Sequence, residues 1–223
     1  RMLTKQVIAA LTEAAGAATA CDALRALSSA RELLGANADA CEPLFNELAR
    51  RSEELQRLRD LAGRDPLTDA ANRRTFEEEL AREAARQRRT HEPFAVILFD
   101  LDDLKVRNDR FGHAAGDEAL TALVQACLRT VRGTDVVARL GGDEFAVLLP
   151  GSNHVGASTL AARLRAAIEQ AEVTGGSLRV SMGIAAAEYA RGDAERVVQS
   201  ADRDLYQDKA LRKARPEADS CAA

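Results

Sequence analysis

Several residue types that build common kinds of site are scarce in this chain. Its 223 residues include four cysteines and three histidines, scattered along the sequence: Cys21, Cys41, Cys127, Cys221, His91, His113 and His154. None of these spacings is typical of zinc or haem ligands, so the sequence excludes the usual forms of both sites. We expect the cysteines to be reduced, as in a cytoplasmic enzyme, and Cys21 and Cys41 to be buried rather than a redox pair.

Long apolar runs and an excess of positive charge are also missing. The longest apolar run is far shorter than the ~20 residues that span a bilayer, and the stretch between Lys5 and Glu13 is too short for a signal peptide. With 31 basic and 35 acidic residues, the net charge of −4 does not favour nucleic-acid binding. We therefore expect a cytoplasmic protein with no membrane segment in this chain and no nucleic-acid partner.

The N-terminal region is rich in alanine and leucine at helical spacing. Residues 4–19 and 22–34 predict two helices, and Pro43 fits the first turn of a third. The third helix carries a heptad pattern, with these positions on one face: Leu44, Leu48, Arg51, Leu55, Leu58 and Ala62. Only one of them is charged, so residues 44–62 form either a parallel dimer stalk or a helix packed within its own chain. We favour the stalk, and expect residues 1–63 to be a helical signalling and dimerisation region.

After Pro66, short apolar runs alternate with helical patterns. The expected helices are residues 72–89, 102–110, 116–131, 154–172 and 194–213, and the expected strands are residues 94–100, 136–140, 144–149 and 177–186. A tight hairpin joins the second and third of these strands. Alternating helices and strands with one hairpin predict a mixed α/β sheet flanked by helices, not an all-parallel sheet.

The hairpin sequence Gly141-Gly142-Asp143-Glu144-Phe145 places two carboxylates beside a pair of glycines. The glycines permit a tight turn with positive φ, and the apolar residues that follow predict a strand. Adjacent carboxylates beside bare backbone are typical of sites that hold a divalent cation near a phosphate. Taken alone, the same residues are equally compatible with a surface hairpin whose acids face water.

A second group of acids follows the apolar run Phe94–Phe99. Asp100 directly continues this run, which predicts a strand buried on both faces. Asp102 and Asp103 come next and fit the start of a helix, where the helix dipole favours acids. Asp100 is harder to explain in this way, because a buried carboxylate costs several kcal/mol unless it is paired or bound to metal. Together, the two acid groups would make a site for magnesium and a nucleoside triphosphate.

Further short motifs stand in a fixed order around these acids. They are Asp65–Asp69 with Asn72–Arg74, Phe99–Lys105, Asn108–His113 with Gly116-Asp117, Arg139–Phe145, Ser181–Ala185, and Ala201-Asp202 through Lys209. In order and spacing they resemble the diguanylate cyclase domains of the GGDEF family, over residues 64–215, which leaves 216–223 as a C-terminal tail. The resemblance implies a nucleotidyl-cyclase-like fold, and an enzyme that condenses two GTP into cyclic di-GMP and releases two pyrophosphates. It also implies a homodimer with two Mg²⁺ ions per active site, for which Mn²⁺ could substitute.

The resemblance implies roles for the acids and for one lysine. The residues that match the family's metal ligands are Asp100, Asp143, Glu144 and, through its carbonyl, Leu101. Asp143, which is catalytic together with Glu144, matches the residue that takes the proton from the ribose 3′-hydroxyl, because a bound cation lowers the pKa of that hydroxyl. Lys105 matches the lysine that steadies charge on the transferring phosphate.

The resemblance also implies how the substrate is held. Asn108 and Asp117 match the residues that read guanine, and a carboxylate at 117 accepts from two donors that adenine does not offer, which favours GTP over ATP. His113 lies in the same motif and is assigned to the substrate site. Lys209 and Lys213 match positions of the last helix that hold the terminal phosphates.

Arg132 and Asp135 occupy the family position of an inhibitory product site. An arginine can form paired hydrogen bonds with a phosphate or a guanine edge, and an aspartate can accept from the guanine donors. The pattern Arg-x-x-Asp alone often arises by chance, but its distance from Gly141 favours the functional interpretation. We expect cyclic di-GMP to bind there and inhibit the enzyme.

A few residues depart from the family pattern. Arg107 stands where an aliphatic residue is usual, and Asp204 and Asp208 stand where alanines are common. Lys213 takes a place usually held by arginine, which would lose the bidentate contact. None of these changes removes a metal ligand or a guanine reader, so we expect an active enzyme. The alternative is a catalytically weak or inactive GGDEF-type receptor that binds GTP or cyclic di-GMP and signals through its helices.

Overall fold

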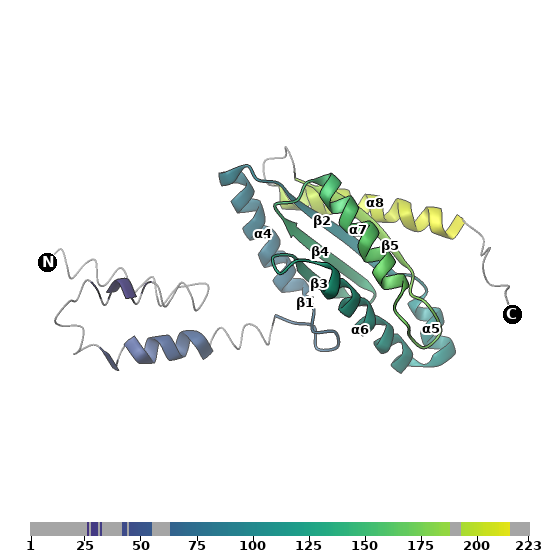
Figure 1. Cartoon of the computed structure of the whole chain (residues 1–223), viewed down its shortest axis with the longest axis horizontal. Coiled ribbons are helices and arrows are strands. Elements are labelled where there is room, and N and C mark those ends of the chain that lie inside the picture. The colour runs from purple at the N-terminus through teal and green to yellow at the C-terminus, as the bar shows by residue number, and fades with distance from the viewer. Residues whose placement is uncertain are drawn as a thin grey trace. The chain divides into compact units, whose positions relative to one another are not determined.

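The computed structural model describes residues 26, 28–30, 32, 42–43, 45–54, 63–187 and 193–214, apart from the side chains of the last two (Figure 1). The chain divides into two compact units, Arg1–Gly63 and Arg64–Ala223. The helix expected over 4–19 lies outside the described residues, as do these cysteines: Cys21, Cys41 and Cys221. Among the described helices, none combines the length and the apolar character that crossing a bilayer requires.

In the first unit, residues 45–54 are helical. Leu48 and Arg51 of the heptad pattern lie on this helix. The other heptad positions are outside the described residues: Leu44, Leu55, Leu58 and Ala62. Arg51 donates from Nε to Oε1 of Glu47 at 2.7 Å, and hydrogen bonds from Arg50 and Arg51 lower the pKa of Glu47 to about 2. The one charged heptad position is therefore paired along its own helix, and the dimer stalk stays a prediction.

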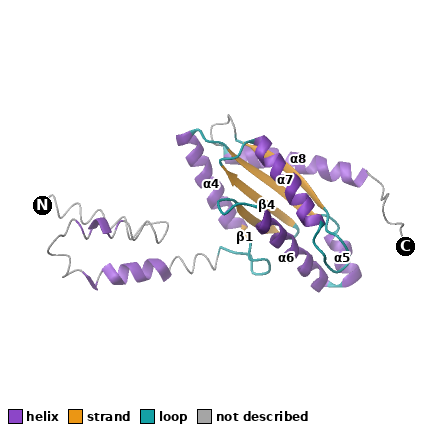
Figure 2. Cartoon of the chain, in the orientation of Figure 1, coloured by secondary structure: helices purple, strands orange, loops and turns teal. Residues whose placement is uncertain are grey.

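The second unit is built on a five-stranded sheet with the strand order β1-β3-β4-β2-β5. The strands are β1 (Ala71–Asn72), β2 (Phe94–Leu101), β3 (Val136–Gly141), β4 (Glu144–Pro150) and β5 (Val180–Ala186). The helices are α4 (Arg73–Thr90), α5 (Leu104–Phe111), α6 (His113–Thr130), α7 (His154–Glu169) and α8 (Ala194–Ala214) (Figure 2). β1 pairs with β3 in parallel, and the other neighbouring strands are antiparallel. The predicted mixed sheet flanked by helices is confirmed; the two-residue strand β1 was not predicted.

β2 lies between β4 and β5, and all of its residues are buried. Its side chains alternate between two cores, as the period of a strand requires. Ile97 and Phe99 belong to the core that α6 and α7 cover, while Val96 and Leu98 belong to the core that α4 and α8 cover (Figure 1). The ring of Phe99 stacks on that of Phe145 in β4 at 5.5 Å. Packing on both faces therefore fixes the end of β2, where the acids begin.

Three element boundaries differ from the sequence-based expectation by three residues. α7 ends at Glu169 rather than at 172, and the other two boundaries lie close to glycines. α6 begins at His113 rather than at 116, because Gly112 adopts φ 85, ends α5 and turns the chain directly into the next helix. β5 begins at Val180 rather than at 177. The connection before it turns at Gly175-Gly176, where both residues have φ 90. The differences at α6 and β5 come from glycines in a conformation that other residues rarely adopt.

Candidate active site

The two acid groups meet where β2 ends beside the β3–β4 hairpin. Asp100 lies opposite Glu144 in the antiparallel register of β2 and β4, and the N–H of Leu101 donates to the carbonyl of Asp143 at 3.0 Å. The turn residues Gly141-Gly142 have φ 151 and 52, a conformation that would strain any residue with a side chain. The glycine turn thus holds both hairpin carboxylates beside the end of the buried strand.

Asp100 is almost completely buried. Its exposed fraction is 8%, and Nζ of Lys209 lies 2.8 Å from its Oδ2. Burial raises the pKa of Asp100 above its usual value, and the nearby charge of Asp143 adds to this, while Lys209 offsets part of the effect. Glu144 is exposed and reaches Arg73 at 3.6 Å. The acids together present more negative charge than Lys209 balances, which suits a divalent cation.

The other two acids after β2 are engaged away from the hairpin. Asp102 accepts a hydrogen bond from the hydroxyl of Ser181 at 2.8 Å, and burial raises its pKa above the usual value. Asp103 precedes α5 in a left-handed conformation with φ 59, makes no capping bond with its side chain, and pairs with Arg179 at 3.2 Å. Asp103 is thus a helix-start residue, as one interpretation of the sequence held, although it does not cap the helix.

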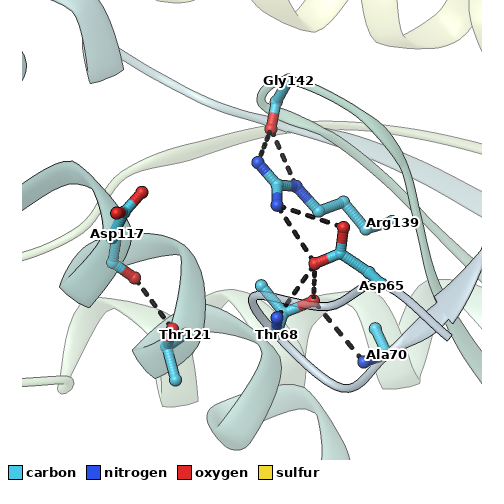
Figure 3. Close-up of polar contacts among 7 residues, drawn as sticks. All are labelled: Asp65, Thr68, Ala70, Asp117, Thr121, Arg139 and Gly142. Atoms are coloured by element: carbon cyan, nitrogen blue, oxygen red, sulfur yellow. Dashed lines mark hydrogen bonds and ion pairs between the residues drawn. The ribbon is translucent and has the colours of Figure 1, made fainter. Parts of the chain in front are cut away.

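The hairpin is fastened to the start of the domain by Arg139 (Figure 3). Its guanidinium donates to the carbonyl of Gly142 from Nε at 3.0 Å and from Nη2 at 2.8 Å, and to Asp65 from Nη1 at 3.1 Å. Asp65 also accepts from the N–H and the hydroxyl of Thr68. Burial alone would raise the pKa of Asp65, but the hydrogen bonds from Thr68 and Arg139 outweigh it and lower that pKa. The sequence showed both motifs but not that Arg139 joins them.

Asn108 and Asp117, the expected guanine readers, lie on the consecutive helices α5 and α6. Oδ1 of Asn108 is buried and has no hydrogen-bond partner among the described residues. It lies against Gly116, where an added Cβ would come within 1.9 Å of it. Asp117 and His113 are exposed, and the carboxylate of Asp117 points away from α6 (Figure 3). This helix pair offers oxygen acceptors to a ligand that carries several N–H donors.

The lysines assigned to the phosphates come from two helices. Lys105 is exposed on the first turn of α5. Lys209 lies on α8 and reaches the acids through its ion pair with Asp100. Lys213 also lies on α8, but its side chain is outside the described residues. The structure therefore brings Lys209 to the carboxylates, while phosphate contacts of all three lysines stay predictions.

Arg132 and Asp135 form a tight turn between α6 and β3. Oδ2 of Asp135 accepts from the N–H of Arg132 at 2.9 Å, and the N–H of Asp135 donates to the carbonyl of Arg132 at 3.0 Å. The Arg132 residue is exposed. Arg163 of α7 donates from Nη2 to the carbonyl of Thr130, two residues before the turn, at 3.2 Å. Arg163 is a further basic side chain near this turn, and no sequence pattern pointed to it.

The unusual Arg107 fastens α5 to the connection between α7 and β5. Its guanidinium donates to the carbonyls of Thr174, Gly176 and Ser177, the last two at 3.2 and 3.3 Å. Glu118 of α6 accepts from the N–H of Thr174 at 3.2 Å. Arg107, although it departs from the family pattern, thus holds α5, the helix that carries Asn108, against the connection between α7 and β5.

A mixed sheet whose glycine hairpin sets two carboxylates beside a buried strand-end acid is typical of α/β domains that handle nucleotides. Comparison with known families makes this specific, because residues 62–215 match the family described as "Diguanylate cyclase, GGDEF domain". The chain belongs to the GGDEF family, as its motifs predicted.

Curated relatives carry the corresponding name. The probable diguanylate cyclase DgcC of Escherichia coli (strain K12) is 34% identical over 161 residues, which cover 71% of this chain and 43% of DgcC. Diguanylate cyclase DosC of the same strain is 35% identical over 167 residues, which cover 73% of this chain and 34% of DosC. The chain therefore spans less than half the length of these relatives.

Solved structures share the fold. One is the coiled coil and GGDEF domain of DgcB from Caulobacter crescentus in complex with c-di-GMP. It is 27% identical, with a TM-score of 0.67, and the match covers 79% of this chain and 95% of that chain. The arrangement of the sheet and its helices is thus that of a GGDEF domain.

Proposed function

We propose that this chain is a diguanylate cyclase, which condenses two GTP into cyclic di-GMP and releases two pyrophosphates. The observation that carries the proposal is the meeting of Asp100 with Asp143 and Glu144 at the end of β2. The names of the relatives DgcC and DosC support it. Asp143 accepts the proton of a ribose 3′-hydroxyl as that oxygen bonds to the α-phosphorus of the second GTP, and the bond from this phosphorus to pyrophosphate breaks.

The donor chemistry of the acids fits magnesium or manganese. No three histidine, cysteine or acid side chains of the described residues form a ready-made metal group. The oxygens that would hold two Mg²⁺ or Mn²⁺ ions are the carboxylates of Asp100, Asp143 and Glu144 and the carbonyl of Leu101, all hard ligands of the kind these ions prefer. Bound metal would neutralise phosphate charge and lower the pKa of the attacking hydroxyl.

GTP is selected through its base and held through its phosphates. The guanine edge donates from N1 and from the 2-amino group, which matches the exposed carboxylate of Asp117. The amide of Asn108 lies on the neighbouring helix α5, and its Oδ1 has no hydrogen-bond partner among the described residues. Lys105 and Lys209 supply point charges for the phosphates, with Lys213 beyond them on α8. With GTP and metal bound, Lys209 would leave Asp100 and pair with a phosphate oxygen instead. His113 lies at the start of α6 beside the base readers.

Two GTP molecules must meet face to face, so the active form is a homodimer with catalysis between two domains. Residues 1–63 serve as a helical dimerisation and signalling region with a stalk over 44–62, followed by the cyclase domain 64–215 and the tail 216–223. The DgcB structure, which combines a coiled coil with a GGDEF domain, supports this division. We place the protein in the cytoplasm, where GTP and magnesium are available.

Product inhibition is proposed at the turn formed by Arg132 and Asp135. The exposed Arg132 offers a bidentate contact to a phosphate or guanine edge, and Arg163 stands near the same turn. The presence of c-di-GMP in the DgcB structure supports the choice of ligand.

A second candidate is a receptor that binds GTP or cyclic di-GMP without turnover. The observation that favours it is the ion pair between Lys209 and Asp100 at 2.8 Å, because a metal ion would have to compete with this lysine.

The test compares the wild type with Asp143→Asn in GTP and Mg²⁺ and measures cyclic di-GMP. Losing the general base should lower the rate about 10²- to 10⁴-fold while the fold survives. Glu77→Gln, which removes an exposed acid of α4, is the matched control and should keep the wild-type rate. Near-normal turnover by Asp143→Asn would refute the mechanism. GTP binding by the wild type with no product would favour the receptor.

A further inference from the structure

β5 is the edge strand of the sheet, so no strand of the described residues pairs with the outer side of its backbone. Two carboxylates of α8 take that place. Oδ2 of Asp208 accepts from the N–H of Met182, and Oδ2 of Asp204 accepts from the N–H of Ile184, both at 2.8 Å. These two acids are the residues that stand where the family commonly has alanine.

The spacing of the two acids matches the strand. Four residues along a helix advance about 6 Å, and two residues along a strand advance about 6.6 Å. Asp204 and Asp208 therefore stay in step with Ile184 and Met182, with the helix running opposite to β5. Two hydrogen bonds at this separation fix both the position of α8 along the strand and its rotation about its own axis.

Other contacts fix the remaining freedom of the helix. Gly183 lets α8 approach closely, since a Cβ at this position would lie 2.0 Å from the carbonyl oxygen of Ala201 and 2.2 Å from the nitrogen of Leu205. Asp208 also pairs with Arg165 of α7 at 3.0 Å. Because α7 and α8 cover opposite faces of the sheet, Asp208 joins the two layers across the edge of β5.

The geometry points to Asp208, assisted by Asp204, as a positioning residue that aims Lys209 at the active-site carboxylates. Lys209 is the next residue on α8, so its direction is set once Asp208 is held, about 100° away around the helix. Its Nζ then lies 2.8 Å from Asp100. The inference rests on the proposed function for the role of Lys209 towards GTP. It adds that this chain orients its phosphate lysine through an acid that the family pattern lacks.

The experiment is a double-mutant cycle of Asp208→Ala and Lys209→Ala. It measures the affinity for α,β-methylene GTP with Mg²⁺, an analogue that cannot react at the α-phosphorus. In the wild type, Asp208→Ala should weaken binding about fivefold, which corresponds to the net free energy of one or two hydrogen bonds. In the Lys209→Ala background, the same substitution should weaken binding little further. Asp208→Asn, which keeps an oxygen for the N–H of Met182, should recover most of the affinity. Gln207→Ala, an exposed neighbour on α8, is the control.

Hydrogen exchange at the amide of Met182 measures, independently of ligand binding, whether the hydrogen bond from β5 to residue 208 is kept. It should be faster in Asp208→Ala and near the wild-type rate in Asp208→Asn. Losses of affinity that simply add in the double variant would overturn the inference, because Asp208 would then act apart from Lys209. Binding is read without turnover, so a wild type that makes no cyclic di-GMP would refute the proposed function alone.

Discussion

Replacing Gly116 by alanine should move Asn108, the proposed guanine reader, without unfolding the domain. The new Cβ would lie 1.9 Å from Oδ1 of Asn108 and 2.9 Å from its Cγ, whereas ordinary contacts lie at 3.4–4 Å. The amide must therefore retreat by about 1.5 Å, which is large against the tolerance of a hydrogen bond. Because it is the end of a side chain that yields, and because alanine favours the helix by up to about 1 kcal/mol, the melting temperature should not fall.

Loss of one hydrogen bond to the base predicts a kcat/KM for GTP about three- to tenfold below the wild type. The assay is steady-state synthesis of cyclic di-GMP, paired with thermal unfolding of the same preparation. Gly156→Ala is the matched control, because it also lies in a helix and its added Cβ would contact Oδ1 of Asn153 at an ordinary 3.4 Å. Wild-type kinetics in Gly116→Ala would contradict the role of Asn108, and a sharply lower melting temperature would contradict the view that Asn108 absorbs the clash.

Three further predictions concern the fold, the product site and the stalk. Gly183→Ala places a Cβ against the backbone of α8 and should lower the free energy of unfolding by about 1–3 kcal/mol. The melting temperature should fall by about 2–4 °C for each kcal/mol. An unchanged melting temperature would show that α8 can move away from β5 without loss of stability. Arg132→Ala should keep the initial rate but relieve inhibition by added cyclic di-GMP, and equal inhibition of both proteins would reduce the Arg-x-x-Asp match to coincidence. A fragment of residues 64–223 should be monomeric, with activity per subunit that rises steeply with protein concentration, because it lacks the proposed stalk that would raise the effective concentration of the domains. Activity equal to that of the full chain at low concentration would contradict the stalk.

The sequence predicted the central strand and the hairpin because their signals are local. The run Phe94–Phe99 is apolar at every position, as a strand buried on both faces requires, and Gly141-Gly142 marks a turn that other residues resist. These local signals place an acid group at each element, and the register of β2 with β4 sets Asp100 opposite Glu144.

The contacts that depend on how distant elements pack could not be predicted. β1 is only two residues long and is defined by its parallel pairing with β3, which leaves no periodic signal. The bonds of Arg139 to Asp65 join residues far apart in sequence. Asp204 and Asp208 stood out in the sequence only as departures from the family pattern. Their hydrogen bonds to Ile184 and Met182 depend on how α8 packs against β5, which the sequence does not state.

The most direct test of the proposed activity is to incubate the purified chain with GTP and Mg²⁺ and quantify both products over time. We predict two pyrophosphates for each cyclic di-GMP, with no cyclic product when ATP replaces GTP. GTP that is recovered unchanged, or pyrophosphate that appears without cyclic di-GMP, would contradict the proposed activity.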